Sequence, residues 1–132
     1  MIVTKIRCCG CNKRRVEARL TNGAEIYPHR KDLHSLPFWK CDDCGNFVGC
    51  HHKNKKNKIQ PLGCIPTPEI KKKRQKIHLV LDPIWQSGKM KRQEIYNLIS
   101  EHLGYRYHTA TTRSVEECDR VLDYLDSLVG GL

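Results

Sequence analysis

The stretches Cys8-Cys9-Gly10-Cys11 and Cys41-Asp42-Asp43-Cys44 decide the fold of this 132-residue chain. Each is a CxxC motif, in which one tight backbone turn brings two thiolates to the same metal ion. Two such motifs with strand-forming residues between them are typical of a zinc ribbon. We therefore predict that one structural Zn²⁺ is held by Cys8, Cys11, Cys41 and Cys44.

The alternative interpretation of a CxxC motif is a redox-active pair. Such a pair normally lies in a βαβ unit, and the sequence shows no pattern for one. Cys9 serves as a ligand only if the CxxC spacing is broken, so we expect it to be a bystander or an alternative ligand. Cys64 and Cys118 are expected to be structural, because Cys118 falls on the apolar stripe of a helix.

The environment of the protein follows from its cysteines and from its apolar segments. No stretch approaches the roughly 20 apolar residues of a membrane span, and the first residues lack the apolar segment of a signal peptide. We therefore expect no membrane partner and a location in a reducing cytoplasm, where thiols remain available to a metal.

Positive charge is concentrated in one part of the chain. The formal net charge is +10, and residues 53–76 carry nine Lys or Arg against one acid, Glu69. Such a segment favours binding to polyanions, with lysine and arginine neutralising phosphates. The nucleic-acid-binding residues that we predict are Lys53, Lys55, Lys56, Lys58, Lys71, Lys72, Lys73, Arg74 and Lys76.

The sequence predicts an α+β architecture, with a zinc-ribbon-like β module followed by a three-helix part. We assign residues 1–52 to the module, residues 53–67 to a mobile basic Pro/Gly loop, and residues 68–132 to helices that pack on the module as one compact unit. Asn22-Gly23 between strand-like runs is a strong hairpin signal. The expected strands are residues 14–20, 24–27, 38–40 and 46–48.

Three helices are expected from apolar periodicity and from cap residues. The first begins at Thr67-Pro68 and runs to about Leu81, where Asp82-Pro83 ends or redirects it. The second spans residues 89–103 and stops at Gly104. The third begins after Ser114, the first residue of a capping box, and continues to Gly130-Gly131.

Several histidines permit a different chemistry. His78 and Asp82 are four residues apart, so they share one face of a helix, and Cys50 is followed directly by His51 and His52. An oriented His–Asp pair serves as an acid–base pair or as metal ligands, and it is also a common structural contact. A bound second ion would make the protein a metal-dependent nuclease, with His51, His52, His78, Asp82 and His108 as candidate residues.

The order of these motifs resembles the zinc-finger-containing domain family of phages and prophages. The resemblance extends over nearly the whole chain and implies a zinc site, a phage or prophage origin and an unassigned biochemical role. It draws attention to the candidates His51, His78, Asp82, Trp85 and His108. The chain departs from the family in a Lys-Asn-rich insert between His52 and Pro61 and in Cys64. The segments that carry the resemblance are 23–28, 38–44, 48–51 and 61–63, followed by Arg74, His78, Asp82 and Trp85.

Three functions therefore compete. The favoured one is a small zinc protein that binds nucleic acid through a basic loop and helix. The second is the metal-dependent nuclease, for which Asp82 is the main available carboxylate. The third is a non-enzymatic phage protein that binds and modulates a host protein. The sequence leaves the choice of DNA or RNA and the oligomeric state open.

Overall fold

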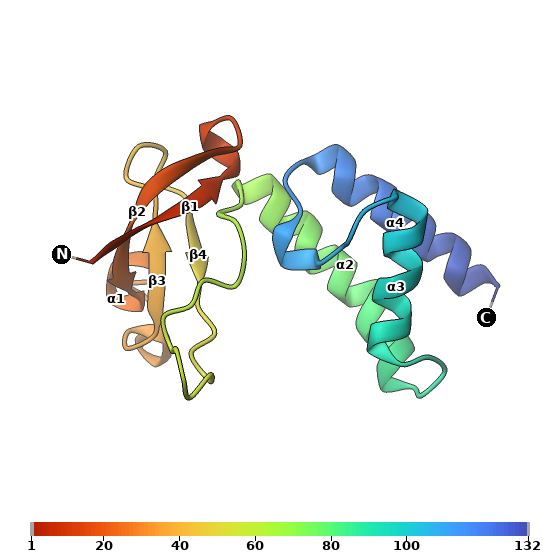
Figure 1. The fold of residues 1–132 in the computed structure, drawn as a ribbon. Coiled ribbons are helices and arrows are strands. Elements are labelled where there is room, and N and C mark those ends of the chain that lie inside the picture. Colours follow the sequence, from red (N-terminus) through yellow and green to blue (C-terminus); the bar gives the residue numbers. More distant parts are fainter. Residues whose placement is uncertain (1, 132) are drawn as a thin grey trace. The chain divides into compact units, whose positions relative to one another are not determined.

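The structure, a computed structural model, describes residues 2–131. The chain forms two compact units that divide between Thr67 and Pro68. The first unit contains an antiparallel sheet and the second contains three long helices (Figure 1). The predicted α+β class with an N-terminal zinc-ribbon-like module is confirmed, whereas the packing of the helices on that module stays a prediction.

The sheet of unit 1 has four strands in the order β1-β2-β3-β4. The predicted strand pair around the second CxxC motif is confirmed as β3 and β4, in which Trp39 lies opposite Val48. The first strand was not expected, although its alternating and β-branched residues carry a strand signal. The strands are β1 (Val3–Cys8), β2 (Arg14–Asn22), β3 (Pro37–Lys40) and β4 (Phe47–Gly49).

The hairpin expected at Asn22-Gly23 is wrong. Strand β2 ends at Asn22, and the residues expected to form a return strand begin a short helix, α1 (Gly23–Ile26). The side chain of Asn22 accepts a hydrogen bond from the backbone N–H of Ala24, so it caps this helix. A Cβ at Gly23 would lie 1.7 Å from the carbonyl oxygen of Leu33, so the close approach of this backbone requires glycine.

The first CxxC motif forms the true hairpin connection. Cys8 at the end of β1 lies opposite Arg14 at the start of β2. Between them, Cys9–Cys11 form a 3-10 turn, and Asn12 and Lys13 have left-handed backbones with φ of 61° and 62°. Asparagine tolerates this conformation better than most residues.

One face of the sheet is covered by residues that were expected to lie in a mobile loop. Ile65 is fully buried and pairs in parallel with Cys8. The indole N–H of Trp39 donates to the carbonyl oxygen of Ile59 at 2.6 Å. Residues 59–65 therefore belong to the module, because the apolar face of a sheet must be covered. The buried cluster contains Ile6, Cys8, Ala18, Trp39, Cys41, Val48, Cys50 and Ile65.

Unit 2 contains α2 (Pro68–Gln86), α3 (Arg92–Leu103) and α4 (Val115–Gly130). The predicted start of α2 at Pro68 and the stop of α3 at Gly104, with φ of 83°, are confirmed. The cap of α4 is also confirmed, because the hydroxyl of Ser114 accepts from the N–H of Glu117 at 3.1 Å. The core of unit 2 includes the fully buried residues Ile77, Leu81, Ile95, Ile99, Val121 and Leu125.

The expectation that Asp82-Pro83 ends or redirects α2 near Leu81 is wrong. The helix continues through Pro83 to Gln86. Ile77, Leu81 and Ile84 are buried at helical spacing on both sides of the proline, so the apolar stripe holds the helix together across it. Pro83 itself is exposed, which leaves solvent to hydrogen bond the carbonyl that its missing N–H cannot reach.

Among the described helices, none is both long enough and apolar enough to cross a membrane.

Candidate metal centre and nucleic-acid interface

Two short backbone turns place four thiols at the same point of unit 1. In the first turn, the N–H of Cys11 hydrogen bonds the sulfur of Cys8. In the second, the N–H of Asn46 hydrogen bonds the sulfur of Cys44, and Gly45 adopts φ of 80°. Amide groups that point at sulfur stabilise the thiolate form that a metal requires.

The first turn also approaches the second closely. A Cβ on Gly10 would lie 2.4 Å from the side-chain amide nitrogen of Asn46 and 3.3 Å from the sulfur of Cys44. A larger residue would displace the Asn46 side chain and press on the Cys44 sulfur, so glycine suits the close approach of the two turns.

The distances between the sulfurs fit a tetrahedral zinc site. All four ligand atoms lie within 4.8 Å of one another. The Sγ atoms of Cys8 and Cys44 are 3.4 Å apart, and those of Cys11 and Cys41 are 3.6 Å apart. Zinc–sulfur bonds of about 2.3 Å imply a tetrahedral edge of about 3.8 Å, whereas a disulfide needs a separation of about 2.05 Å. The cluster therefore has the dimensions of a metal site.

Without a metal, the surroundings of Cys8 and Cys11 favour the protonated form of their thiols. Burial raises the pKa of Cys8 above its ordinary value, and a hydrogen bond to Cys41 raises the pKa of Cys11 to about 11. Desolvation also acts to raise the pKa of Cys44, but hydrogen bonds from the Asn46 amide and the neighbouring thiols lower it overall. Zinc binding displaces protons from these thiols. The affinity of the site for zinc therefore falls as the pH is lowered.

These features define a class: an α+β protein whose N-terminal module is built around a four-cysteine zinc site. The model of the zinc-finger-containing domain family matches residues 4–127, and the chain belongs to this family. The match confirms the zinc-finger resemblance and, with the cysteine cluster, supports one structural Zn²⁺. Comparison with curated proteins and with solved structures finds no match. The phage or prophage origin stays a prediction.

Among residues 2–131, the histidine candidates do not gather into a second metal centre within either unit. In this part of the chain, only the four cysteines form a group of three or more potential metal ligands. His51 and His52 are exposed residues of unit 1. The ring of His108, in unit 2, accepts a hydrogen bond from the Ala110 N–H at 3.3 Å and stacks on Tyr96. Neither unit by itself therefore gathers the ligands for the second ion that the nuclease interpretation requires.

The expected contact between His78 and Asp82 is present on α2. The Nδ1 atom of His78 lies 3.4 Å from Oδ1 of Asp82, and the same oxygen accepts a hydrogen bond from the indole of Trp85 at 3.0 Å. One carboxylate thus contacts two side chains, those of His78 and Trp85, on neighbouring turns of one helix. The contact fits both the acid–base and the structural interpretation of this pair, and the choice between them stays a prediction.

The basic residues of α2 divide into two groups. Lys72 and Lys76 are exposed, whereas Lys73 forms an ion pair with Asp119 at 2.6 Å. Arg74 is partly buried, and its guanidinium donates to the hydroxyl and the carbonyl oxygen of Thr112 at 2.8 and 2.6 Å. Two of the predicted phosphate ligands are therefore engaged in contacts within unit 2.

Replacing Arg74 with lysine is expected to destabilise the protein by about 1–3 kcal/mol, because lysine keeps the charge but cannot make both hydrogen bonds to buried Thr112. Urea unfolding followed by helical circular dichroism measures this change. Lys76→Gln, on the exposed side of the same helix, is the control and should shift the free energy of unfolding by less than about 0.5 kcal/mol. Unchanged stability of Arg74→Lys would contradict the structural role.

Sequence reasoning missed a second basic region, on the β1–β2 hairpin. Arg7 and Arg15 lie directly opposite each other, and Lys5 lies opposite Glu17. The guanidinium of Arg7 donates to the carbonyl oxygen of Lys13 at 2.7 Å, which fixes it beside the turn. These residues are scattered in the sequence. The strand pattern of β1 was the signal that could have placed them side by side.

Proposed function

We propose that the protein binds nucleic acid through the phosphate backbone, with the basic loop of unit 1 as its principal contact. The observation that carries the proposal is the exposure of all four loop lysines on a loop whose ends are fixed. The N–H of His51 donates to the carbonyl oxygen of Gln60 at 2.8 Å, and Cys50 pairs with Pro61. The four lysines are Lys53, Lys55, Lys56 and Lys58.

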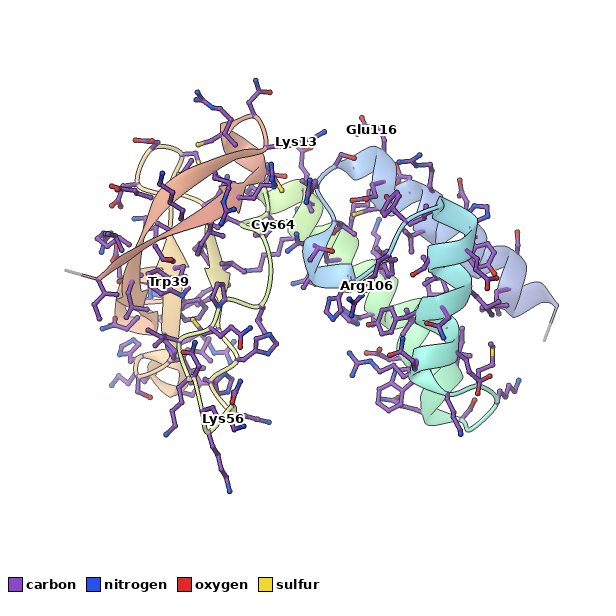
Figure 2. All side chains as sticks on the ribbon, viewed as in Figure 1. Lys13, Trp39, Lys56, Cys64, Arg106 and Glu116 are labelled. Carbon is purple, nitrogen blue, oxygen red and sulfur yellow. The ribbon has the colours of Figure 1, made fainter. Side chains whose placement is uncertain are left out.

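The asparagines between the lysines shape this loop. The side chain of Asn54 accepts from the N–H of Lys56 at 3.0 Å, and that of Asn57 accepts from the N–H of Ile59 at 3.2 Å. These Asx turns bend the backbone locally. Figure 2 shows Lys56 at the tip of the loop, with its side chain directed away from the sheet. The bonds at both ends of the loop and its Asx turns thus favour one backbone conformation, which holds the lysines exposed to solvent.

The β1–β2 hairpin supports the same proposal. Like charges directly opposite each other destabilise an antiparallel pair, and Arg7 and Arg15 are placed in this way. A phosphate between them would remove the repulsion and form charge-assisted hydrogen bonds with both guanidinium groups. The hairpin therefore offers an additional contact to the same polyanion.

The aromatic residues of unit 1 favour recognition without base stacking. Tyr27, Phe38 and Phe47 pack edge-to-face on one another, with ring centroids 5.5–6.0 Å apart. Rings used in this way are not available as platforms for bases. We therefore expect binding that depends on phosphates, that is largely independent of base sequence, and that takes place in the cytoplasm, where thiolate ligands are stable.

The test is a salt series of nucleic-acid binding by the zinc-loaded full chain, with duplex and single-stranded oligonucleotides of one sequence. Lys55→Gln/Lys56→Gln is expected to reduce the slope of log K against log salt for duplex DNA by about 2, because each lost phosphate contact contributes about 0.9. The matched control is Lys89→Gln/Lys91→Gln, which removes the same charge from exposed positions elsewhere.

Equal slopes for the loop variant and the control would show that net charge, and not the loop, governs binding. A parent protein whose affinity for both oligonucleotides hardly changes with salt would reject the proposed function.

A further inference from the structure

Two cysteines outside the metal cluster lie in contact with each other. The Sγ atoms of Cys9 and Cys64 are 3.9 Å apart, although 55 positions separate the two residues in the sequence. Neither belongs to the four-cysteine group. Cys9 is partly exposed and Cys64 is buried, so reagents in solution reach the pair from the side of Cys9.

The backbone holds this pair in place. The N–H of Ile65 donates to the carbonyl oxygen of Arg7 at 2.8 Å, and the N–H of Cys9 donates to the carbonyl oxygen of Ile65 at 2.9 Å. These two bonds form the parallel bridge between Cys8 and Ile65. The bridge brings the neighbouring residues Cys9 and Cys64 close together, with their sulfurs in contact.

We propose that Cys9 and Cys64 form a redox-active dithiol that closes to a disulfide when the protein meets a disulfide oxidant such as oxidised glutathione. The two sulfurs are already at contact distance, and a bond requires them to approach to about 2.05 Å. The hydrogen-bonded backbone limits how far they can separate, which favours ring closure over reaction with a second oxidant molecule.

The reaction proceeds by two thiol–disulfide exchanges. The thiolate of Cys9 attacks one sulfur of oxidised glutathione, breaks its S–S bond and releases one glutathione thiolate. The thiolate of Cys64 then attacks the Cys9 sulfur of this mixed disulfide and releases the second glutathione. The protein loses two protons and two electrons, which reduce one oxidised glutathione to two glutathione thiols.

The crosslink would tie the zinc module together. The covalent ring from Cys9 to Cys64 contains Cys11, Cys41, Cys44 and the whole basic loop, and it begins next to the fourth ligand, Cys8. A bond at the adjacent position opposes separation of Ile65 from Cys8, and with it the loosening of the strand end that carries this ligand. The oxidised protein is therefore expected to lose zinc to a chelator more slowly than the reduced protein.

The experiment exposes the zinc-loaded full chain to glutathione buffers of increasing oxidised fraction, blocks remaining thiols by alkylation, and maps linked peptides by mass spectrometry. The expected result is a peptide that joins Cys9 to Cys64, with one zinc retained per chain. Cys64→Ser should accumulate a glutathione adduct on Cys9, because the resolving thiol is missing. Cys9→Ser should give neither product, and buried Cys118 is the internal control.

A different result would overturn the proposal. If Cys9 and Cys64 remain fully alkylated in buffers that oxidise the zinc ligands and release the metal, the pair is not a preferred redox site. The same conclusion follows if Cys64→Ser collects no adduct on Cys9 while retaining its zinc. Zinc content and the circular dichroism spectrum of each variant show that it is folded when it is tested.

Discussion

Replacing Cys41 with serine is expected to abolish zinc binding and to unfold unit 1, while the helices of unit 2 remain. A structural zinc in a small four-ligand site provides an apparent binding free energy of about 10–16 kcal/mol near neutral pH. Cys41 is almost fully buried and belongs both to the metal cluster and to the apolar core. Its loss removes a ligand and leaves the remaining thiols crowded without an ion.

Metal content per chain measured by mass spectrometry, together with amide NMR spectra of the two units, checks this prediction. The spectrum of residues 1–67 should collapse to unfolded positions, while peaks from α2, α3 and α4 stay dispersed. The matched control is Cys9→Ser, which changes a neighbouring thiol outside the cluster and should retain one zinc. A Cys41→Ser protein that still holds one zinc would show that the ligand set is wrong.

The second large effect is expected in the core of unit 2. Leu81→Ala should lower the free energy of unfolding of this unit by about 2–5 kcal/mol, because it removes buried methyl groups and leaves a cavity. Leu81 is fully buried on α2, whereas Leu79 on the same helix is 75% exposed. The same substitution at the two positions therefore compares burial with exposure at nearly constant helix propensity.

Urea unfolding of the zinc-loaded chain, followed by helical circular dichroism, measures both variants. Leu79→Ala should change the free energy of unfolding by less than about 0.5 kcal/mol. Similar losses for the two variants would mean that the exposed face of α2 is covered in solution, by a second copy or by another part of the chain.

Local chemistry was sufficient to predict the metal site and most helix boundaries. The CxxC spacing identifies the ligands because two thiols on one tight turn have few other structural uses. Pro68, Gly104 and Ser114 mark helix ends because each supplies a conformation or a hydrogen bond that a helix terminus needs. These three signals act within a few residues and need no contact from distant parts of the chain.

The failures have a common physical cause, which is that one local signal serves two structures. Asn22-Gly23 is the usual hairpin pair, but asparagine is also a good helix cap, and here the approach of the Leu33 backbone decides for the helix. Pro83 usually breaks a helix, but the buried stripe on both sides of it holds α2 together. Ile59 and Ile65 gave no periodic signal, because their partners come from distant strands.

The same limit applies to the functional residues. The lysines of the loop lie within six residues of sequence and were found by charge alone, whereas Arg7 and Arg15 become neighbours only through the β1–β2 register. Cys9 and Cys64 likewise meet only because residues 64–65 return to β1. Sequence patterns that span a few residues cannot predict which residues long-range pairing brings together.

The parallel bridge between Cys8 and Ile65 also sets an order of events during synthesis. Cys44, the last of the four metal ligands, leaves the ribosome before Ile65, which completes the core around them. Synthesis therefore makes all four thiols available to the ion before Ile65 completes the buried cluster beside Cys8 and Cys41.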